Sequence, residues 1–418
     1  MRALLVTNLY PSRDEPTRGV FNLSRFSALA RHCEVRVVSP LPWWSRLKRP
    51  VQLLRAPSDG SSGLEAIFPT YWSMPGRPSL HAAGMYLSLR GTLKRIRRQF
   101  PYDVLLAAWA YPEGVAAARF AREAGIPLVT MVLGSDINEF PRQPELRKRI
   151  RWGLGQSQRV VAVSRALAQR VMELGVPPER VLAQHNGVDG ERFQPRDRAQ
   201  ARLRLGLPAD RSRVTYVGNY KPEKGVEVLV EAFGLLRQSG QTEVSLSLVG
   251  SGPLEPKLRA RVQELGLQEQ VQLHGRRPHE EVPEWIAATN VLCLPSYREG
   301  CPNVVLESLA SGRPVVASDV GGVSELLDER GGGLVPAGDP DALARALRRN
   351  LNRDWDPGTL RGLVECLSWD QYGWTLHGAL EAARQEFGRS PSEGVTVSRL
   401  APPPVTLTER AGIPPSAR

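Results

Sequence analysis

The stretch Arg298-Glu299-Gly300-Cys301-Pro302-Asn303-Val304-Val305-Leu306-Glu307 places two carboxylates eight positions apart, with a Gly-Cys-Pro-Asn turn between them. The apolar run 291–294 precedes it and predicts a buried strand, and a helix is expected to continue toward Gly312. Pro302 suits the first helical position, because the N–H that proline lacks would have no partner there. The amides of residues 303–305 would then be free at a helix N-terminus, where an anion is favoured.

The two glutamates of this stretch allow two interpretations. Glu299 precedes the expected helix and Glu307 lies inside it, so both can reach one ligand whose phosphates bind at the amides. The same spacing also arises by accident from a solvated loop glutamate and a surface helix glutamate. The surrounding sequence decides between them.

The length of 418 residues exceeds one ordinary core and predicts two domains. With 41% hydrophobic and 23% charged residues, the composition is that of a soluble globular protein, and no run of 18 apolar residues predicts a membrane span. Residues 1–8 are typical of a buried first strand rather than of a signal peptide. The four cysteines show neither metal spacing nor a disulfide framework, which favours the cytoplasm.

The net charge of +12 is unevenly distributed. Residues 1–190 hold 27 Lys and Arg against 14 Asp and Glu, whereas the remainder is close to neutral. The excess is concentrated at residues 90–98 and 142–151. Such runs are often solvated helix faces, but they also fit an anionic membrane surface or an anionic acceptor. Nucleic acid is not expected, because no aromatic residues are interleaved with the charges.

Short apolar runs alternate with helix-period stretches, which indicates parallel sheets covered on both faces. The predicted strands are 2–7, 34–38, 104–107, 128–133, 159–162, 213–217, 244–249, 271–273, 291–294 and 315–317. The predicted helices are 21–30, 86–98, 113–124, 165–174, 226–238 and 254–265. Residues 41–79 are expected to form an irregular excursion.

These patterns predict an α/β fold of two doubly wound, Rossmann-like domains that face each other across a cleft. We assign 1–190 to the first domain, 191–212 to a linker and 213–365 to the second domain. A helix at 366–387 is expected to cross back to the first domain. The Pro-rich tail 388–418 is expected to be disordered.

The second domain opens with Gly218-Asn219-Tyr220-Lys221-Pro222-Glu223-Lys224-Gly225 after its first strand. Gly218 would let the backbone approach a ligand closely, and Lys224 can neutralise a phosphate at the helix entrance. Residues 249–253 repeat the order strand, glycine, helix. Each signal is common when taken alone.

Together with Glu299 and Glu307, these segments resemble the donor site of GT-B glycosyltransferases of the retaining family 4 (group 1) type. The resemblance extends to Gly321-Gly322-Val323-Ser324-Glu325 and to residues 186–189, and it covers the chain to about residue 385. It implies that the first domain lies on the acceptor side and that the second domain binds a nucleotide sugar.

The resemblance also implies roles for individual residues. Glu307 would hold the ribose hydroxyls of the donor, Glu299 would contact the transferred sugar, and Lys224 would stabilise the leaving diphosphate. Arg276 would border the base. The segment that would bind sugar hydroxyls and phosphate through its amides consists of Cys301, Pro302, Asn303 and Val304.

Two positions depart from the family pattern. Asn219 stands where an arginine is usual, so one cation is missing unless Lys221 or a first-domain arginine replaces it. Leu133 stands where a histidine is common, in Leu133-Gly134-Ser135-Asp136. Asp136 either faces the acceptor side or is an ordinary helix N-cap, and Gly19 is the remaining match in the first loop.

No metal and no cofactor are expected. The Asp354-Trp355-Asp356 sequence lies in a polar connector rather than after a buried strand, and the six histidines have no ligand spacing. A GT-B phosphorylase or sugar-nucleotide epimerase is one alternative function, but a phosphorylase needs a lysine-bound pyridoxal group, for which no environment is evident. A non-catalytic partner subunit is the other alternative.

The favoured function is transfer of a sugar, with retention, from a nucleotide diphosphate sugar to a lipid-linked or polysaccharide acceptor in cell-surface glycan synthesis. The expected partners are therefore the nucleotide sugar, the acceptor and an anionic membrane surface that attracts the basic first domain. The expected location is the cytoplasm, at the inner face of the membrane.

Overall fold

The computed structural model describes residues 1–12, 15, 18–48 and 64–387. They form a first unit, Met1–Asn186 with residues 369–387, and a second unit, Gly187–Ser368. The tail 388–418, expected to be disordered, lies outside the described residues, as do positions 13–14 and 16–17 of the first loop and residues 49–63 of the expected excursion.

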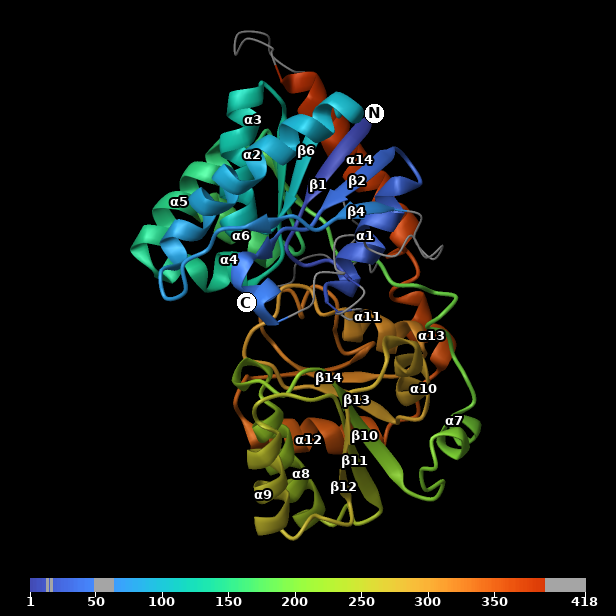
Figure 1. Cartoon of the computed structure of the whole chain (residues 1–418). Coiled ribbons are helices and arrows are strands. Elements are labelled where there is room, and N and C mark those ends of the chain that lie inside the picture. Colours follow the sequence, from blue (N-terminus) through green and yellow to red (C-terminus); the bar gives the residue numbers. More distant parts are fainter. Residues whose placement is uncertain (13–14, 16–17, 49–63, 388–418) are drawn as a thin grey trace. The chain divides into compact units, whose positions relative to one another are not determined.

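The first unit is built on a parallel sheet with seven strands among the described residues (Figure 1). In spatial order they are β4 (Glu65–Ile67), β2 (Glu34–Val38), β1 (Arg2–Val6), β6 (Val104–Ala108), β7 (Leu128–Val132), β8 (Arg159–Ala162) and β9 (Val181–Ala183). Side chains alternate between the two faces of a strand. Ala3 and Leu5 of β1 therefore join one core cluster and Leu4 and Val6 join another.

Helices cover both faces of this sheet. The described helices of the first unit are α1 (Val20–Ala30), α2 (His81–Gln99), α3 (Val115–Ala124), α4 (Ser135–Asn138), α5 (Pro144–Gly155), α6 (Arg165–Glu173) and α14 (Trp369–Glu386). Residues of α1 and α14 pack on one face, and residues of α2 and α3 pack on the other. Short elements at residues 41–80 are β3 (Leu41–Pro42), η1 (Trp43–Lys48), β5 (Thr70–Tyr71) and η2 (Pro78–Leu80).

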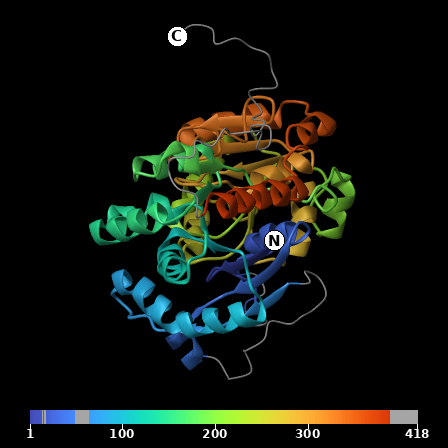
Figure 2. The same cartoon turned by 90° about the horizontal axis from the view of Figure 1, so that it is seen from above.

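The helix α14 belongs to the first unit although it follows the second unit in sequence. Both cartoon views show it beside α1 (Figures 1 and 2). The two backbones approach so closely that a Cβ atom on Gly373 would lie 2.3 Å from the carbonyl oxygen of Ala28. Glycine at this position therefore permits the contact between the two helices.

The second unit contains a parallel sheet with six strands among the described residues. In spatial order they are β12 (Val271–Gly275), β11 (Val244–Val249), β10 (Ser212–Val217), β13 (Val291–Leu294), β14 (Val315–Ser318) and β15 (Gly332–Val335). The surrounding helices are α7 (Arg198–Arg204), α8 (Val226–Gln238), α9 (Glu255–Glu264), α10 (Val282–Ala287), α11 (Asn303–Ala310), α12 (Pro340–Leu351) and α13 (Pro357–Gly362). One core cluster packs α8, α9 and α12 on the sheet, and another packs α10, α11 and α13 on it.

The doubly wound α/β fold is confirmed in each unit, and every predicted strand and helix is present within a few residues of its predicted bounds. Three strands of the two large sheets were not predicted: β4, β9 and β15. The helix expected from residue 113 begins only at Val115, because residues 110–114 form a π-turn, η3 (Ala110–Gly114). The segment 191–212, interpreted as a linker, includes α7, whose Ala201 is fully buried in a core cluster.

We expect Gly373→Ala to destabilise the first unit, because the added methyl group collides with the backbone of α1. Overpacking of this kind costs roughly 1–3 kcal/mol. Gly378→Ala on the same helix is the matched control, since its added Cβ atom would meet nothing within 4 Å. There, better helix propensity should stabilise by up to about 1 kcal/mol. Urea denaturation measures both; equal effects of the two changes would contradict this account of the α1–α14 contact.

Candidate active site

Two loops of the second unit leave the sheet from neighbouring strands. β10 leads into residues 218–225 and β13 leads into residues 295–302. The strand order reverses between these strands, since β11 and β12 lie beyond β10 whereas β14 and β15 lie beyond β13. Ligands of open parallel sheets bind outside the carboxyl ends of strands at such a reversal. The predicted donor residues other than Arg276, which follows β12, therefore come from the two loops that flank this point and from the helix after the second loop.

Lys224 and Glu299 form a salt bridge between these loops, with 2.7 Å between Nζ and Oε1. The hydroxyl of Ser296 donates to the same oxygen at 2.7 Å. The Glu299 side chain is only 9% exposed, so its attraction to Lys224 is screened less than in a surface pair. No other hydrogen bond of the Glu299 carboxylate is found among the described residues, which leaves Oε2 available to a ligand.

Close backbone packing holds this pair in place. A Cβ atom on Gly225 would lie 2.1 Å from the carbonyl oxygen of Pro295, and one on Gly321 would lie 2.0 Å from that of Glu299. Both glycines also have left-handed φ angles, 60° and 57°, that other residues rarely adopt. The loops that follow β10, β13 and β14 are thereby locked together around Glu299.

The start of α11 differs from the sequence expectation. Pro302 is the N-cap with an extended ψ of 108°, and the helix begins at Asn303. Proline fixes only φ, and the turn before the helix sets ψ. The Pro302 carbonyl accepts the N–H of Val305 at 3.2 Å, so the expectation that the Val305 amide is free is wrong.

Glu307 lies within α11 and is buried, with 7% of its surface exposed. Burial raises its pKa to about 7, against the opposing influence of the Arg192 charge. No hydrogen bond of its carboxylate is found within the described part of the chain. Neither carboxylate oxygen is among the fully enclosed polar atoms without a partner in the described part of the chain, so a ligand that donates hydrogen bonds can reach them.

The other predicted donor residues lie on the loops around this centre. Asn219 and Lys221 are exposed in the loop after β10, and Arg276 is exposed after β12. Cys301 and Val304 are half-buried, whereas Pro302 and Asn303 are buried. Gly218 contacts the neighbouring loop, since a Cβ atom on Gly250 would lie 1.8 Å from the Gly218 carbonyl oxygen.

In the first unit, the two predicted residues hold loops at the carboxyl ends of strands. Gly19 has a φ of 65°, and a Cβ atom there would lie 2.3 Å from the Leu9 carbonyl oxygen. Asp136 is fully buried and accepts hydrogen bonds from the amides of Ala110 at 2.9 Å and Gly134 at 2.8 Å. In this structure the Asp136 carboxylate thus fastens the loop after β7 to the turn after β6.

Glu113, in the π-turn η3, was missed as a candidate from sequence. It is fully buried, its Oε1 accepts the amide of Asn8 at 2.9 Å, and its Oε2 is buried without a hydrogen-bond partner. Burial raises its pKa to about 8. It connects the ends of β1 and β6, between which the strand order of this sheet reverses. A carboxylate a few residues after a buried strand was the available signal, but the pattern predicts Glu113 only as the first residue of the helix 113–124.

The described residues contain neither a candidate metal-binding cluster nor a helix that could span a membrane. Among the described residues, no group of three or more His, Cys, Asp or Glu is placed to hold a metal ion. Asp356 instead caps α13 by accepting from the amide and the hydroxyl of Thr359. Within the same described ranges, every helix is too short or too polar to cross a bilayer.

Residues 17–192 match Glycosyltransferase Family 4, and residues 211–353 match Glycosyl transferases group 1. TuaC of Bacillus subtilis, named as a glycosyltransferase of teichuronic acid biosynthesis, is 32% identical over 87% of this chain and 93% of its own length. The chain belongs to the group 1 glycosyltransferases of family 4.

Solved structures agree with this family fold. A sucrose-phosphate synthase from Thermosynechococcus elongatus superimposes with a TM-score of 0.75 at 22% identity, over 93% of this chain and 100% of that one. Anabaena HepE in complex with UDP-glucose superimposes with a TM-score of 0.64 at 19% identity, over 92% and 98%. The expected GT-B fold is confirmed, and the chain is a glycosyltransferase.

Because burial raises the pKa of Glu113, the stability of this glycosyltransferase should depend on pH through this residue. In the unfolded chain the carboxyl ionises near its ordinary pKa of 4.5, whereas in the folded protein it stays protonated up to about pH 8. The unfolded state therefore loses its proton first, and this group lowers the stability as pH rises from about 4.5 to 8. Glu113→Gln cannot ionise and keeps an acceptor for the Asn8 amide.

We expect the free energy of unfolding of Glu113→Gln to fall less than that of the wild type between pH 5 and 8. Urea denaturation across this range measures the difference. Glu173→Gln, at an exposed position of α6, controls for the loss of a carboxylate in the same unit. Parallel pH curves for wild type and Glu113→Gln would show that Glu113 is ionised in the folded protein.

Proposed function

We propose that this glycosyltransferase moves a sugar, with retention, from a nucleotide diphosphate sugar to a lipid-linked or polysaccharide acceptor in cell-surface glycan synthesis. The observation that carries the proposal is the Lys224–Glu299 salt bridge, which lies at the strand-order reversal of the second unit. The carboxyl group of Glu307, a mostly buried residue on the helix that follows, adds a second polar anchor.

The relatives support the substrate class. TuaC is named for teichuronic acid biosynthesis, and WcaL of Escherichia coli, 30% identical over 65% of this chain, is named for colanic acid biosynthesis. The HepE structure contains UDP-glucose. These names make a cell-surface polysaccharide the favoured product and a nucleotide diphosphate sugar the favoured donor.

In the proposed mechanism, the acceptor hydroxyl attacks the anomeric carbon on the face from which the nucleotide leaves. The new bond joins the acceptor oxygen to the anomeric carbon, and the bond from that carbon to the diphosphate breaks. The departing phosphate oxygen accepts the proton of the hydroxyl. Lys224 stabilises the negative charge that develops on the diphosphate, without a metal ion in the proposed reaction.

The two glutamates of the second unit would hold the donor at opposite ends. Glu307 accepts hydrogen bonds from the ribose hydroxyls, which satisfies its buried carboxyl group. Glu299 uses Oε2 to bind a hydroxyl of the transferred sugar, while Oε1 keeps Lys224 in position. Lys221 is exposed in the same loop as Asn219 and is the cation nearest to it in sequence, so we assign it the place of the missing arginine.

We further propose that the enzyme acts as a peripheral protein at the inner face of the membrane. The basic excess of residues 1–190 supports this location, because anionic lipids attract clustered Lys and Arg. A lipid-linked acceptor would be presented at the same surface.

Replacing the donor residues tests the function. In an assay of transfer and hydrolysis with UDP-, GDP- and ADP-sugars, we expect Lys224→Met to lower kcat on the order of 100-fold, because one charge partner of the leaving group is lost. Glu307→Gln should raise the donor Kd about tenfold through the loss of a charged acceptor. Glu299→Gln should also lower kcat, because the ion pair that positions Lys224 is lost.

Lys257→Met is the matched control for the lysine. Its Nζ also lies 2.7 Å from a glutamate, Glu227, but on the exposed surface between α9 and α8. This change should leave turnover unaltered. Normal turnover in Glu299→Gln together with an unchanged donor Kd in Glu307→Gln would show that the site is elsewhere. A folded wild-type protein that binds no nucleotide sugar would favour a non-catalytic partner subunit.

A further inference from the structure

The first unit exposes large apolar side chains next to one end of α2. Trp43, Trp44, Trp72 and Met74 are 43%, 40%, 45% and 36% exposed, and we refer to them as the tryptophan patch. The indole N–H of Trp43 donates to the carbonyl oxygen of Ser73, and that of Trp44 donates to the hydroxyl of Ser73. These two hydrogen bonds fasten residues 43 and 44 to the segment that carries Trp72 and Met74.

This patch is fixed to the N-terminal half of α2. The amide of Trp72 donates to the Ser88 hydroxyl at 3.0 Å, and a Cβ atom on Gly84 would lie 2.2 Å from the Trp72 carbonyl oxygen. Leu87, between these two helix positions, is 69% exposed. The apolar surface therefore continues from the tryptophan patch onto the helix.

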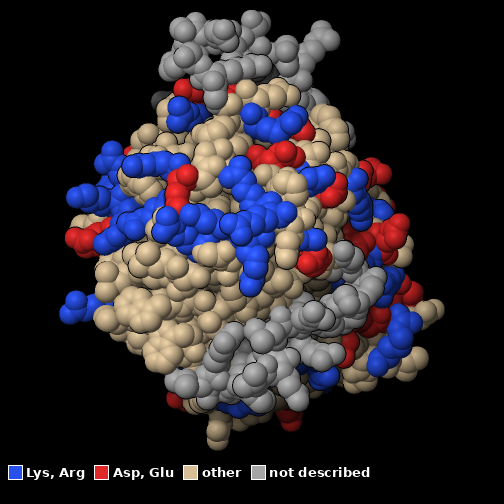
Figure 3. All heavy atoms as spheres, turned by 45° about the horizontal axis from the view of Figure 1, so that its top comes forward, with Lys and Arg blue, Asp and Glu red and all other residues tan. Residues whose placement is uncertain are grey.

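The C-terminal half of the same helix is cationic. Its sequence contains five Lys or Arg, from Arg90 to Arg98, and no Asp or Glu. Figure 3 shows a band of Lys and Arg across this face of the molecule, next to a broad uncharged area. The exposed cations on neighbouring α3 and α5 include Arg122, Arg147 and Lys148.

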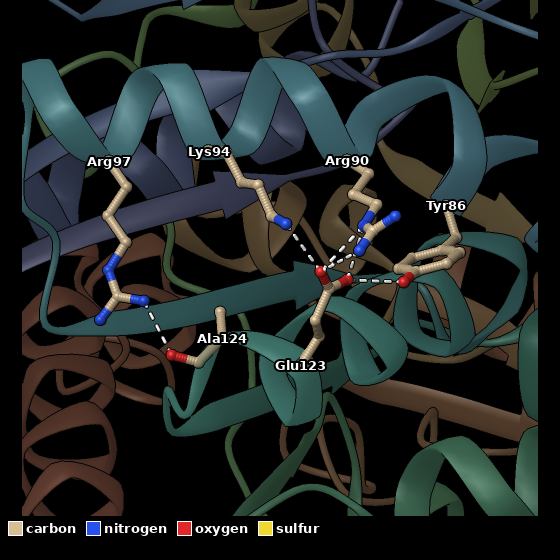
Figure 4. A network of polar contacts seen from close by, with 6 residues as sticks. All are labelled: Tyr86, Arg90, Lys94, Arg97, Glu123 and Ala124. Atoms are coloured by element: carbon tan, nitrogen blue, oxygen red, sulfur yellow. Dashed lines mark hydrogen bonds and ion pairs between the residues drawn. The ribbon is translucent and has the colours of Figure 1, made fainter.

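One carboxylate offsets part of this charge. Glu123 of α3 accepts hydrogen bonds from Arg90, Lys94 and the hydroxyl of Tyr86, and these contacts hold the pKa of Glu123 low, at about 2 (Figure 4). Arg97 donates to a neutral carbonyl, that of Ala124, and so keeps its full charge (Figure 4). Arg95 and Arg98 are exposed and have no ion pair among the described residues.

We infer that this face is a docking surface for an anionic lipid bilayer, into which the tryptophan patch inserts while α2 lies along the headgroups. Exposed contiguous apolar side chains mark interaction sites, and Trp is enriched at the interface between membrane and water. The indole donors of Trp43 and Trp44 are already satisfied within the unit, so their rings need no polar partner. The adjacent cations need anions. An anionic bilayer presents an apolar interior and anionic headgroups at one surface.

This inference deepens the proposed function, because a lipid-linked acceptor would lie at the same bilayer. It does not depend on the donor site, which belongs to the second unit. Vesicle binding and nucleotide-sugar binding can therefore fail separately, and both are measured for every variant.

The first experiment is flotation of the full-length protein with vesicles. We expect binding to vesicles of roughly three parts phosphatidylcholine to one part phosphatidylglycerol and little binding to phosphatidylcholine alone. Binding should weaken as salt rises, because salt screens the attraction. Equal binding to both vesicle types, or none to either, would overturn the proposal.

Charge reversal tests the cationic half of α2. Arg95→Glu combined with Arg98→Glu should lower the partition coefficient at low salt at least about tenfold. Arg345→Glu combined with Arg348→Glu is the matched control, since these residues have the same spacing on α12 and are also exposed. The control should bind vesicles like the wild type, and an equal loss in both variants would show that only net charge matters.

Removal of the indoles tests insertion. Trp43→Ala combined with Trp44→Ala should lower vesicle binding about tenfold, and this loss should persist at high salt, because apolar insertion is not screened. Trp374→Ala, 49% exposed on α14 of the same unit, is the control and should bind normally. Unchanged donor binding and an unchanged melting temperature show that the double variant is folded.

A soluble acidic polysaccharide is the competing occupant. Polygalacturonate is the probe for this occupant. If it binds the wild type and binds the double variant Trp43→Ala, Trp44→Ala more weakly, while no vesicle binding is seen, the face is a glycan site and the lipid proposal is wrong. If vesicle binding alone depends on both sets of residues, the bilayer is the occupant.

Discussion

The salt bridge between Lys224 and Glu299 is the contact on which the candidate site of the second unit depends. It joins loops that leave neighbouring strands, and the hydroxyl of Ser296 holds the shared carboxylate oxygen from the other side. Gly225 and Gly321 make this arrangement sterically possible. A side chain at either position would collide with a main-chain carbonyl oxygen, that of Pro295 or that of Glu299. A lysine that is already oriented loses little side-chain freedom when a diphosphate binds, so under the proposed function this ion pair prepares the site before the donor arrives.

Much of the fold follows from the sequence because buried parallel strands are short apolar runs separated by helical periods. β6, β7 and β13 have this form and were predicted with nearly correct bounds. β15 was missed because Gly332 and Gly333 give it no apolar signal, although a Cβ atom at Gly332 would lie 1.7 Å from the Val315 carbonyl oxygen. The strand is defined by its close approach to β14, which is a tertiary property.

The site was predictable only in part, for a related reason. The glutamates, the lysine loop and their common edge follow from motifs and strand order, but the sequence does not show that Lys224 reaches Glu299. The position of Pro302 was wrong by one residue, because ψ is set by the turn. Glu113 was missed because its neighbour, the Asn8 amide, is 105 positions away in the chain. The tryptophan patch likewise combines residues 43–44 with residues 72–74.

The charges on α2 contribute little to folding. Exposed ion pairs are worth about 0–1 kcal/mol each, and Glu123 is a single carboxylate shared by Arg90 and Lys94. Further cations at 95, 97 and 98 repel one another along the helix, and only Arg97 and Arg98, in its last turn, gain from the helix dipole. A helix that gains so little from its charges, and that carries exposed Leu87 between them and the indoles, is better explained by a partner than by the stability of the unit. An anionic bilayer relieves the repulsion and covers the apolar area in one step, which neither a neutral glycan nor water would do.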